Sequence, residues 1–207
     1  MNQKNSLGLD LCFKDLEDPL ALFTIWLSEA EKNEINDPNA FSLATTSDKN
    51  EPSVRMVLLK GLSKKGFVFY TNLNSPKSLD LKKNPKASMC FHWKSLQRQV
   101  RISGVVKKVS DEEANLYFKS RPYESRIGAW ASDQSKVMKS KEDLLKKIKD
   151  FEKKYTDKKE LPRPEHWSGW CLSPSIIEFW LGEKFRIHER LRYKKLSNSW
   201  EKEILYP

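Results

Sequence analysis

The stretch S-V-R-M-V-L-L-K (53–60), G-L-S-K-K-G (61–66), F-V-F-Y-T (67–71) decides the fold of this chain. Two runs of β-forming residues flank a turn with glycine at both ends, which predicts a strand, a turn and a second strand. Arg55 and Lys60 stand five positions apart in the first run. An odd spacing directs two side chains to opposite faces of a strand. We therefore expect one cation on each side of the sheet, each able to hold an anion.

The composition limits the class of protein. The 207 residues suffice for one domain with a hydrophobic core. The 38 Lys and Arg residues against 28 Asp and Glu give a net charge of +10, which favours an anionic partner. Charge alone leaves nucleic acid, a lipid surface and phosphorylated small molecules open, and solvated lysine-rich faces account for part of the excess.

Several kinds of site are not expected. Cys12, Cys90 and Cys171 form no C-x-x-C pair, and the three histidines are well separated, so neither a disulfide framework nor a metal site is predicted. No apolar run approaches the roughly 18 residues of a membrane span. The N-terminus has no apolar core of the signal-peptide type, and a cytoplasmic location is the expectation.

The rest of the chain is predicted to alternate strands with inserted helices. Helices are expected from caps and apolar spacing over 18–32, 75–84, 110–119, 123–131 and 140–155. Further strands are expected over 40–46, 86–93, 97–109, 169–172, 176–181, 187–194 and 200–205. We expect an irregularity in the second hairpin at Gly104 and a linker over Lys158–Pro164. This pattern predicts an α+β, mainly β architecture: an antiparallel barrel with flanking helices. Residues 1–17 are expected to be a flexible segment, and 18–207 a single domain.

Cations beside aromatic and small polar residues form four groups. They are Arg55, Lys60, Tyr70, Thr71, Ser75 and Lys77; then Gln99 and Arg101; then Tyr117, Arg121, Ser125, Gln134 and Ser135; and finally Trp180, Arg186, His188 and Arg190. The members of the last cluster, 186, 188 and 190, alternate, so they would project from one face of a strand. Like charges on one face repel unless an anion or a π surface lies between them. Taken singly, each residue also has an ordinary structural explanation, as a strand-end charge, a core aromatic or a surface histidine.

Two common nucleotide motifs are missing. G-L-S-K-K-G-F spaces its glycines like a P-loop, but Phe67 stands where that motif requires lysine. The chain contains no G-x-G-x-x-G, which argues against a Rossmann dinucleotide site.

Seven segments together resemble the pyridoxine (pyridoxamine) 5′-phosphate oxidase family. They are R-M-V-L-L-K (55–60), F-V-F-Y-T-N (67–72), R-Q-V-R-I-S-G (98–104), Y-F-x-S-R-P-x-x-S-R-I-G-A-W-A-S-x-Q-S (117–135), P-R-P-x-H-W-x-G-W (162–170), I-E-F-W (177–180) and R-I-H-E-R (186–190). The resemblance implies an FMN-binding split β-barrel and a homodimer with FMN at the subunit interface. It also implies oxidation of pyridoxamine or pyridoxine 5′-phosphate to pyridoxal 5′-phosphate, with O2 as acceptor and H2O2 as product.

The same resemblance assigns the site residues. It places FMN against Arg55, Met56, Val57, Leu58, Leu59, Lys60, Tyr70, Thr71, Lys77, Gln99, Gln134, Ser135, Trp180 and Arg190. It places the substrate phosphate against Lys60, Tyr117, Arg121 and Ser125, with Arg186 and His188 over the substrate ring as the catalytic pair. Two phosphorylated ligands need two cationic seats, and clusters of arginine and hydroxyl groups suit phosphate.

Three positions depart from the family pattern. Pro76 stands where the family has an arginine before Lys77, and Leu181 stands where a glutamine commonly follows the tryptophan. The family's N-terminal Arg-x-x-Tyr, which helps to close over the substrate, has no match in residues 1–17.

Two other classes of function compete with the oxidase. A non-catalytic FMN- or haem-binding split barrel would not need the substrate residues, and all six of these are present here. A nucleic-acid-binding module would use the net charge of +10 and would show steep salt dependence of binding.

Overall fold

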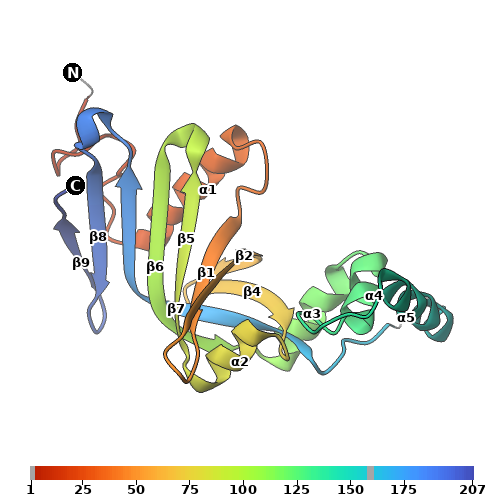
Figure 1. Cartoon of the computed structure of the whole chain (residues 1–207). Helices are drawn as coiled ribbons and strands as arrows, with labels where there is room; N and C mark the ends of the chain where they lie inside the picture. Colours follow the sequence, from red (N-terminus) through yellow and green to blue (C-terminus); the bar gives the residue numbers. More distant parts are fainter. Residues whose placement is uncertain (1–2, 158–160) are drawn as a thin grey trace.

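The strands of the computed structural model form one antiparallel sheet, with helices behind it and at one end (Figure 1); residues 3–157 and 161–207 are described. The strands are β1 Ala40–Thr46, β2 Pro52–Leu58, β3 Gly61–Ser63, β4 Gly66–Asn72, β5 Lys86–Trp93, β6 Arg98–Lys108, β7 Trp167–Leu181, β8 Glu189–Lys195 and β9 Trp200–Ile204. The helices are α1 Pro19–Asn33, α2 Pro76–Lys83, α3 Asp111–Ser120, α4 Tyr123–Ala131 and α5 Lys141–Lys154. One-turn helices cover Lys94–Leu96 and Lys184–Arg186.

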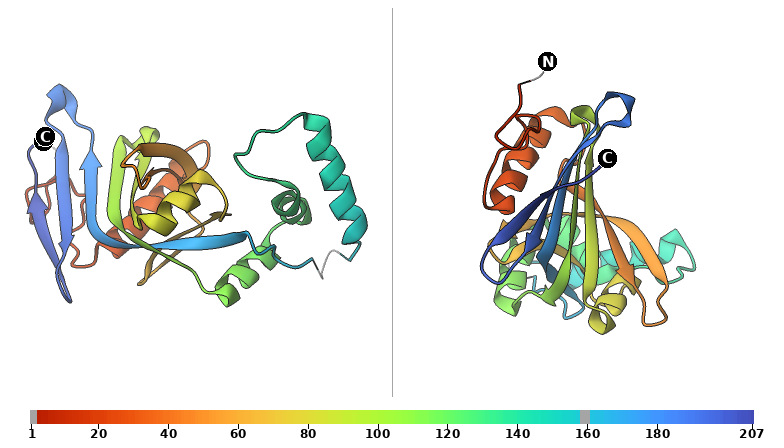
Figure 2. Two further views of the ribbon diagram at one scale, coloured as in Figure 1. Left: turned by 60° about the horizontal axis from the view of Figure 1, so that its bottom comes forward. Right: turned by 90° about the vertical axis from the view of Figure 1, so that its left-hand side faces the viewer.

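The long strand β7 connects the two ends of the molecule. The sheet order is β2-β1-β5-β6-β7-β4-β3, and β8 and β9 continue from another part of β7. The first half of β7 pairs with β4 and the second half with β8, while β6 pairs with both halves. Figures 1 and 2 show β7 running from the α3–α5 helices to the β8–β9 hairpin. Because the partner strand changes along β7, the sheet curls into a half-barrel.

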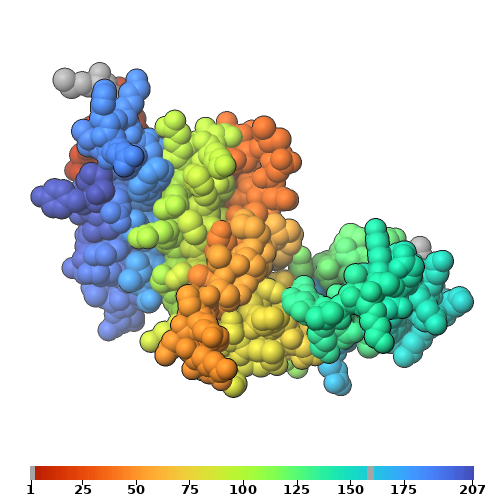
Figure 3. Space-filling model, in the orientation of Figure 1, coloured from red at the N-terminus to blue at the C-terminus, as the bar shows by residue number. Residues whose placement is uncertain are grey.

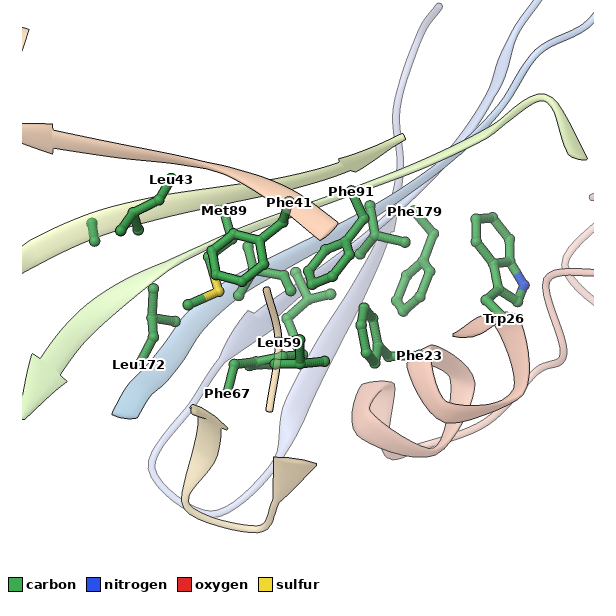
Figure 4. Packing of buried hydrophobic residues seen from close by; sticks show 14 of the residues in the cluster. Phe23, Trp26, Phe41, Leu43, Leu59, Phe67, Met89, Phe91, Leu172 and Phe179 are labelled. Atoms are coloured by element: carbon green, nitrogen blue, oxygen red, sulfur yellow. The ribbon is translucent and has the colours of Figure 1, made fainter. Parts of the chain in front are cut away.

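The core lies between α1 and the inner face of this sheet (Figure 4). Phe23 and Trp26 project from α1 and are fully buried. The Phe23 ring lies edge-on to Phe91 with centroids 5.0 Å apart, and Trp26 lies edge-on to Phe179 at 5.1 Å. Burying large aromatic side chains provides much of the hydrophobic stabilisation of a small core. The helix thus closes one side of the curled sheet.

Most predicted elements are confirmed. Asp18 accepts a hydrogen bond from the Leu20 amide and begins α1, and Ser110 accepts one from the Glu113 amide and begins α3. The irregularity expected at Gly104 is a register shift between Ser103 and Gly104 in the β6–β7 ladder. Of the predicted linker, residues 158–160 lie outside the described residues, and residues 161–164 have no regular secondary structure.

Three predicted strands require correction. The run 53–60 is not one arm of a hairpin with 67–71, because β2 ends at Leu58 and pairs with β1 instead. The hairpin partner of β4 is the short strand β3, which follows Lys60. The predicted strands 169–172 and 176–181 are a single strand, β7, because its ladder with β6 continues past Pro174.

The segment before α1 contacts α1 and β8. Phe13 is fully buried, the indole of Trp26 donates to the Cys12 carbonyl at 2.8 Å, and the Tyr193 hydroxyl donates to the Leu16 carbonyl at 2.9 Å. The flexibility predicted for residues 1–17 stays a prediction, and residues 1–2 lie outside the described part of the chain.

Among the described residues, no helix is both long enough and apolar enough to cross a membrane. In the same part of the chain, no group of three or more His, Cys, Asp or Glu residues could hold a metal ion.

Candidate active site

A cavity of about 510 Å³ lies where β2 and β4 meet α3 and α4. Its size is within the range of roughly 300–1,000 Å³ that is usual for small-molecule sites. Figure 3 shows the face on which α4 and α5 stand out beside β2 and α2. Eleven of the predicted site residues line this cavity: Met56, Val57, Leu58, Lys60, Tyr70, Thr71, Lys77, Tyr117, Arg121, Ser125 and Gln134. The structure thus brings together residues as distant in the sequence as Met56 and Gln134.

Lys77 is held at one end of the cavity by neutral oxygen atoms. Its Nζ atom donates to Thr71 Oγ1 at 3.2 Å, to Ser75 Oγ at 3.2 Å and to Gln134 Oε1 at 3.1 Å. Burial, and to a lesser degree the nearby charge of Arg55, lowers the pKa of Lys77 from its usual value. A partly buried ammonium group whose hydrogen-bond partners are all neutral is a favourable binding site for an anion.

The N-terminus of α2 adds to this seat. Ser75 occupies the N-cap position, but its hydroxyl donates to the Asn72 carbonyl at 2.7 Å and does not cap the helix. Pro76 follows as the first helical residue, as predicted. The free amides and partial positive charge of a helix N-terminus attract phosphate, and here they lie beside Lys77.

Arg55 is fixed by a chain of hydrogen bonds that ends at a carboxylate. Its guanidinium donates to Thr45 Oγ1 at 2.8 Å, to Ser53 Oγ at 2.5 Å and to the Leu43 carbonyl at 3.1 Å. The Thr45 hydroxyl in turn donates to Asp80 Oδ2 at 2.7 Å. Burial lowers the pKa of Arg55, and the charge of Asp80 opposes this effect. Asp80, on α2, therefore steadies Arg55 without forming a direct salt bridge with it.

Arg121 lines the cavity together with Tyr117 and Ser125. It follows α3 directly, and its guanidinium carbon lies 4.8 Å from the ring centroid of Trp167. Its Nη1 atom is buried and has no hydrogen-bond partner among the described residues. Burial is the main cause that lowers the pKa of Arg121. An unpaired buried guanidinium nitrogen needs an acceptor, and phosphate supplies several.

The charges of the cavity are uncompensated. Lys60, Lys77 and Arg121 line it, and no carboxylate does so among the described residues. A second cavity, of about 890 Å³, lies between the start of α1 and the β8–β9 hairpin, and its five lysines are mixed with three carboxylates. The smaller cavity is the better candidate for phosphorylated ligands because its cations face one another without an acidic partner.

The remaining predicted residues lie elsewhere on the chain. Gln99, Trp180 and Arg190 occupy facing positions on β6, β7 and β8, and His188 lies against Trp180 with ring centroids 4.7 Å apart. Arg190 pairs with the buried Glu178, which also pairs with Arg101.

This second group is far from the cavity. Trp167 lines the cavity, and Trp180 is 13 residues further along the same strand. That length of strand spans up to about 40 Å. Within one chain, the two groups of residues predicted to bind FMN therefore lie apart.

The geometry predicted for residues 186–190 was wrong. Arg186 ends a one-turn helix, and His188 precedes the strand, which begins only at Glu189. Phe185 and Arg186 have φ values of 58° and 63°, so the backbone turns there and cannot continue the strand. His188 Nδ1 accepts the Glu183 amide at 3.1 Å, which holds the turn together.

Besides the distant group, three predicted residues do not line the cavity, namely Arg55, Leu59 and Ser135, and several lining residues were missed. The Leu59 side chain is buried in the main core, and Ser135 lies outside the cavity, in the loop before α5. The lining residues that sequence reasoning did not assign are Asn72, Gly128, Ala129, Ser132 and Trp167. Gly128, Ala129, Ser132 and Trp167 occur inside the motifs 117–135 and 162–170 without a role given to them, and Asn72 is the last residue of the motif 67–72.

Comparison with known proteins gives a consistent result. The family model described as pyridoxamine 5′-phosphate oxidase matches residues 27–155, and the model of the pyridoxine 5′-phosphate oxidase C-terminal dimerisation region matches residues 167–207. A pyridoxine/pyridoxamine 5′-phosphate oxidase of Pelagibacter ubique (strain HTCC1062) is 61% identical over 100% of both chains.

Two solved structures share the fold. PhzG from Burkholderia lata 383, in complex with tetrahydrophenazine-1-carboxylic acid, is 27% identical with a TM-score of 0.88, covering 95% of this chain and 96% of its own. A pyridoxamine 5′-phosphate oxidase-related, FMN-binding protein from Nostoc punctiforme PCC 73102 is 15% identical with a TM-score of 0.74, covering 92% and 98%. The predicted split-barrel fold is confirmed.

Proposed function

This chain belongs to the pyridoxamine 5′-phosphate oxidase family, and from that premise we propose which of its residues carry out the reaction. It is an FMN-dependent oxidase that converts pyridoxamine and pyridoxine 5′-phosphates to pyridoxal 5′-phosphate, with O2 as acceptor and H2O2 as product. The observation that carries the assignment of residues is the cavity with three cations and no carboxylate among its described lining residues. Two phosphorylated ligands, the cofactor and the substrate, would neutralise that charge.

The FMN phosphate is assigned to the Lys77 end of the cavity. Lys77, Thr71 and Gln134 already form one hydrogen-bonded cluster there, and Arg55 and the N-terminus of α2 lie beside it. The side chains fit a phosphate because they offer hydroxyl and amide groups and a partly buried ammonium group whose partners among the described residues are neutral oxygen atoms. Bound FMN would supply the hydride-accepting chemistry of the reaction, with O2 as the final electron acceptor. The backbone of 56–60 and Tyr70 are assigned to the wall beside it.

The substrate phosphate is assigned to the Arg121 end. Arg121, Tyr117, Ser125 and Lys60 all face the same cavity. Arg121 offers the unpartnered Nη1 atom, and the hydroxyl groups of Tyr117 and Ser125 add neutral donors. Holding the phosphate at this end orients the substrate, so that the carbon attached at ring position 4 faces the cofactor.

The second group of residues is assigned to the site of the partner subunit. The protein is a homodimer, and its C-terminal region belongs to a dimerisation family. Val54 and Met56 on β2 are 68% and 65% exposed in a single chain, so this strand offers apolar surface for a partner subunit to cover. We assign Gln99, Trp180 and Arg190 of one protomer to the FMN of the other, with Arg186 and His188 over the substrate ring. His188 can donate to or accept from the substrate, and a role as obligatory base is not part of the proposal.

A direct assay tests the function. The purified protein should be yellow, bind about one FMN per subunit, and release peroxide when pyridoxamine 5′-phosphate is added. A protein that binds FMN but releases no peroxide with either phosphorylated substrate would be the non-catalytic binder, and the oxidase assignment would fail.

Mixing two inactive variants tests the shared site. Lys77→Ala damages the cavity, and Arg190→Ala damages the second group. If each site uses both groups from different chains, an equimolar mixture that exchanges subunits regains activity in about a quarter of its sites, since one site of each mixed dimer is intact. If the mixture stays as inactive as its parts while subunit exchange is shown by mass spectrometry, both groups act within one chain and the assignment is wrong.

We also propose a cytoplasmic location. The three cysteines are free, which is compatible with a reducing compartment. Fractionation of cells that produce the protein would test this, and recovery with an extracytoplasmic fraction would contradict it.

A further inference from the structure

The motif P-R-P-x-H-W-x-G-W (162–170) has no role in the assignments above, although Trp167 lines the cavity. Its indole lies under the Arg121 guanidinium in a cation–π contact. We propose that Trp167 is a positioning residue: it holds Arg121 in the orientation that receives the substrate phosphate. The proposal rests on the assignment of Arg121 to that phosphate.

The contact has the geometry of a cation–π interaction. The guanidinium carbon of Arg121 lies 4.8 Å from the Trp167 ring centroid and 5.9 Å from that of Phe118. Trp167 is only 6% exposed, so little water competes for the guanidinium on that side. Such contacts are strongest with tryptophan and where water is excluded. The indole therefore occupies one face of the guanidinium and leaves its edge nitrogens for an oxygen ligand.

Trp167 is itself held by Arg163 from the same motif. Arg163 Nη1 donates to the Trp167 carbonyl at 2.6 Å, while Nε donates to Asn115 Oδ1 at 2.8 Å and Nη2 to Asp111 Oδ1 at 2.9 Å. Asp111 and Asn115 lie on α3, the helix that ends directly before Arg121. Arg163 thus ties the start of β7 to this helix, which fixes the indole relative to the guanidinium.

Aromatic rings fix the other side of the indole. Tyr70 lies nearly parallel to Trp167 at 5.2 Å, and Tyr117 stacks on Tyr70 at 4.0 Å. A Cβ atom at Gly169 would come within 2.7 Å of the Tyr70 ring, so the glycine leaves the space that the ring needs. The ring of Tyr117, also assigned to the substrate phosphate, is therefore positioned by the same stack.

A purely structural role for Trp167 makes different predictions. Trp167 packs with Phe118, Ile127 and Leu161 in a small cluster. If that packing were its whole contribution, its loss would lower stability and would act in the same way whether or not Arg121 were present. If it acts through Arg121, its effect on KM disappears when Arg121 is removed.

The test uses Trp167→Leu in the FMN-saturated dimer. We expect KM for pyridoxamine 5′-phosphate to rise about tenfold, and kcat to change less than about threefold, because the indole acts on phosphate binding through a cation–π contact. Trp167→Phe retains a weaker π face and should raise KM only about threefold. The matched control is Trp130→Leu, since Trp130 belongs to the same cluster but contacts Phe151 and Tyr155 rather than Arg121. Its KM should stay within about twofold of the parent value.

A double-mutant cycle with Arg121→Ala decides between the two roles. In the Arg121→Ala background, Trp167→Leu should change KM less than about twofold, because the two residues act as a unit. An equal rise in KM in both backgrounds would overturn the positioning role and leave the proposed function intact. If Arg121→Ala itself left KM unchanged, the phosphate assignment would be the part that fails. Should Trp167→Leu not fold, the same cycle with Trp167→Phe decides, and a threefold rise that persists without Arg121 overturns the proposal.

Discussion

The Nζ atom of Lys77 lies 3.1 Å from Oε1 of Gln134, although the two residues are 57 positions apart. This contact ties the start of α2 to the loop after α4 within one chain. The family resemblance predicts FMN contacts from the early strands together with Gln99, Gln134, Ser135, Trp180 and Arg190, at an interface between two subunits. The structure instead places Gln134 with Lys77 and leaves Gln99, Trp180 and Arg190 as the distant group.

FMN binding should weaken at alkaline pH through Lys77. Burial lowers the pKa of Lys77 from its usual 10.5, so the ammonium form is lost at a lower pH than that of an exposed lysine. The affinity for the FMN phosphate is full below this lowered pKa and falls as the pH rises through it. A flavin fluorescence titration between about pH 7 and pH 10 would show the decline. Lys77→Met should bind FMN weakly at both ends of that range, and an equally steep decline in this variant would assign the effect to another group.

Pro76→Arg should tighten FMN binding. Pro76 is exposed at the first position of α2, beside the seat proposed for the phosphate, and the family has an arginine there. A charge-assisted hydrogen bond contributes roughly 1.5–3 kcal/mol, which corresponds to about a tenfold or larger decrease in Kd. Pro76→Ala serves as the control for removing the proline ring. Equal Kd values for the arginine and alanine variants in a flavin titration would show that the new cation does not reach the phosphate.

Thr45→Val should weaken FMN binding, although Thr45 does not line the cavity. The Thr45 hydroxyl accepts from Arg55 and donates to Asp80, so its loss leaves the guanidinium with one anchor fewer. We expect Kd for FMN to rise about five- to tenfold, since the bond involves a charged donor. Thr45→Ser keeps the hydroxyl and should stay near the parent value. A serine variant as weak as the valine variant would mean that packing of the methyl group, not the hydrogen bond, is what matters.

Arg186 and Arg190 should have separable effects. Arg186→Ala should raise KM and lower kcat together, by more than about tenfold in kcat/KM, while FMN stays bound. His188→Ala should show the same pattern more weakly, and Arg190→Ala should chiefly lose FMN. Steady-state kinetics with the flavin content measured for each preparation would separate these outcomes. A kcat/KM within about twofold of the parent for Arg186→Ala would remove this turn from the substrate site.

Local sequence signals predicted many elements with their observed bounds. Ala40–Thr46, Lys86–Trp93 and Tyr123–Ala131 were predicted with the bounds that the structure shows. The two strands alternate buried and less buried side chains along their length, which is the pattern that identifies a half-buried strand.

Proline and positive φ angles explain the main errors in the predicted strands. The gap predicted between strands 169–172 and 176–181 contains Pro174, which faces Gly104 at the bulge of β6, where the ladder tolerates a residue without an amide donor. The segment 184–186 turns through positive φ at Phe185 and Arg186, neither of which is a residue that usually signals such a turn. Tertiary contacts decide the conformation at both places.

The types of residue that form the candidate site could be predicted from the sequence. The residues that hold these side chains in position could not. The cations and hydroxyl groups were identified by their resemblance to a family. The roles of Thr45, Asp80 and Trp167 depend on contacts between distant segments, such as the 35 positions between Thr45 and Asp80. No periodicity within a segment encodes such a contact.

The segment before α1 has a consequence for biosynthesis. The Asp10 amide donates to Glu189 Oε2 at 2.6 Å, across 179 positions, and Lys202 Nζ donates to Asp15 Oδ1 at 2.6 Å, across 187. Asp10 and Asp15 thus have their partners in a part of the chain that is synthesised much later. Contacts of such long range form late, because a large loop must close before they stabilise anything. Translation must therefore reach the β8–β9 hairpin before the beginning of the chain can settle into its final place.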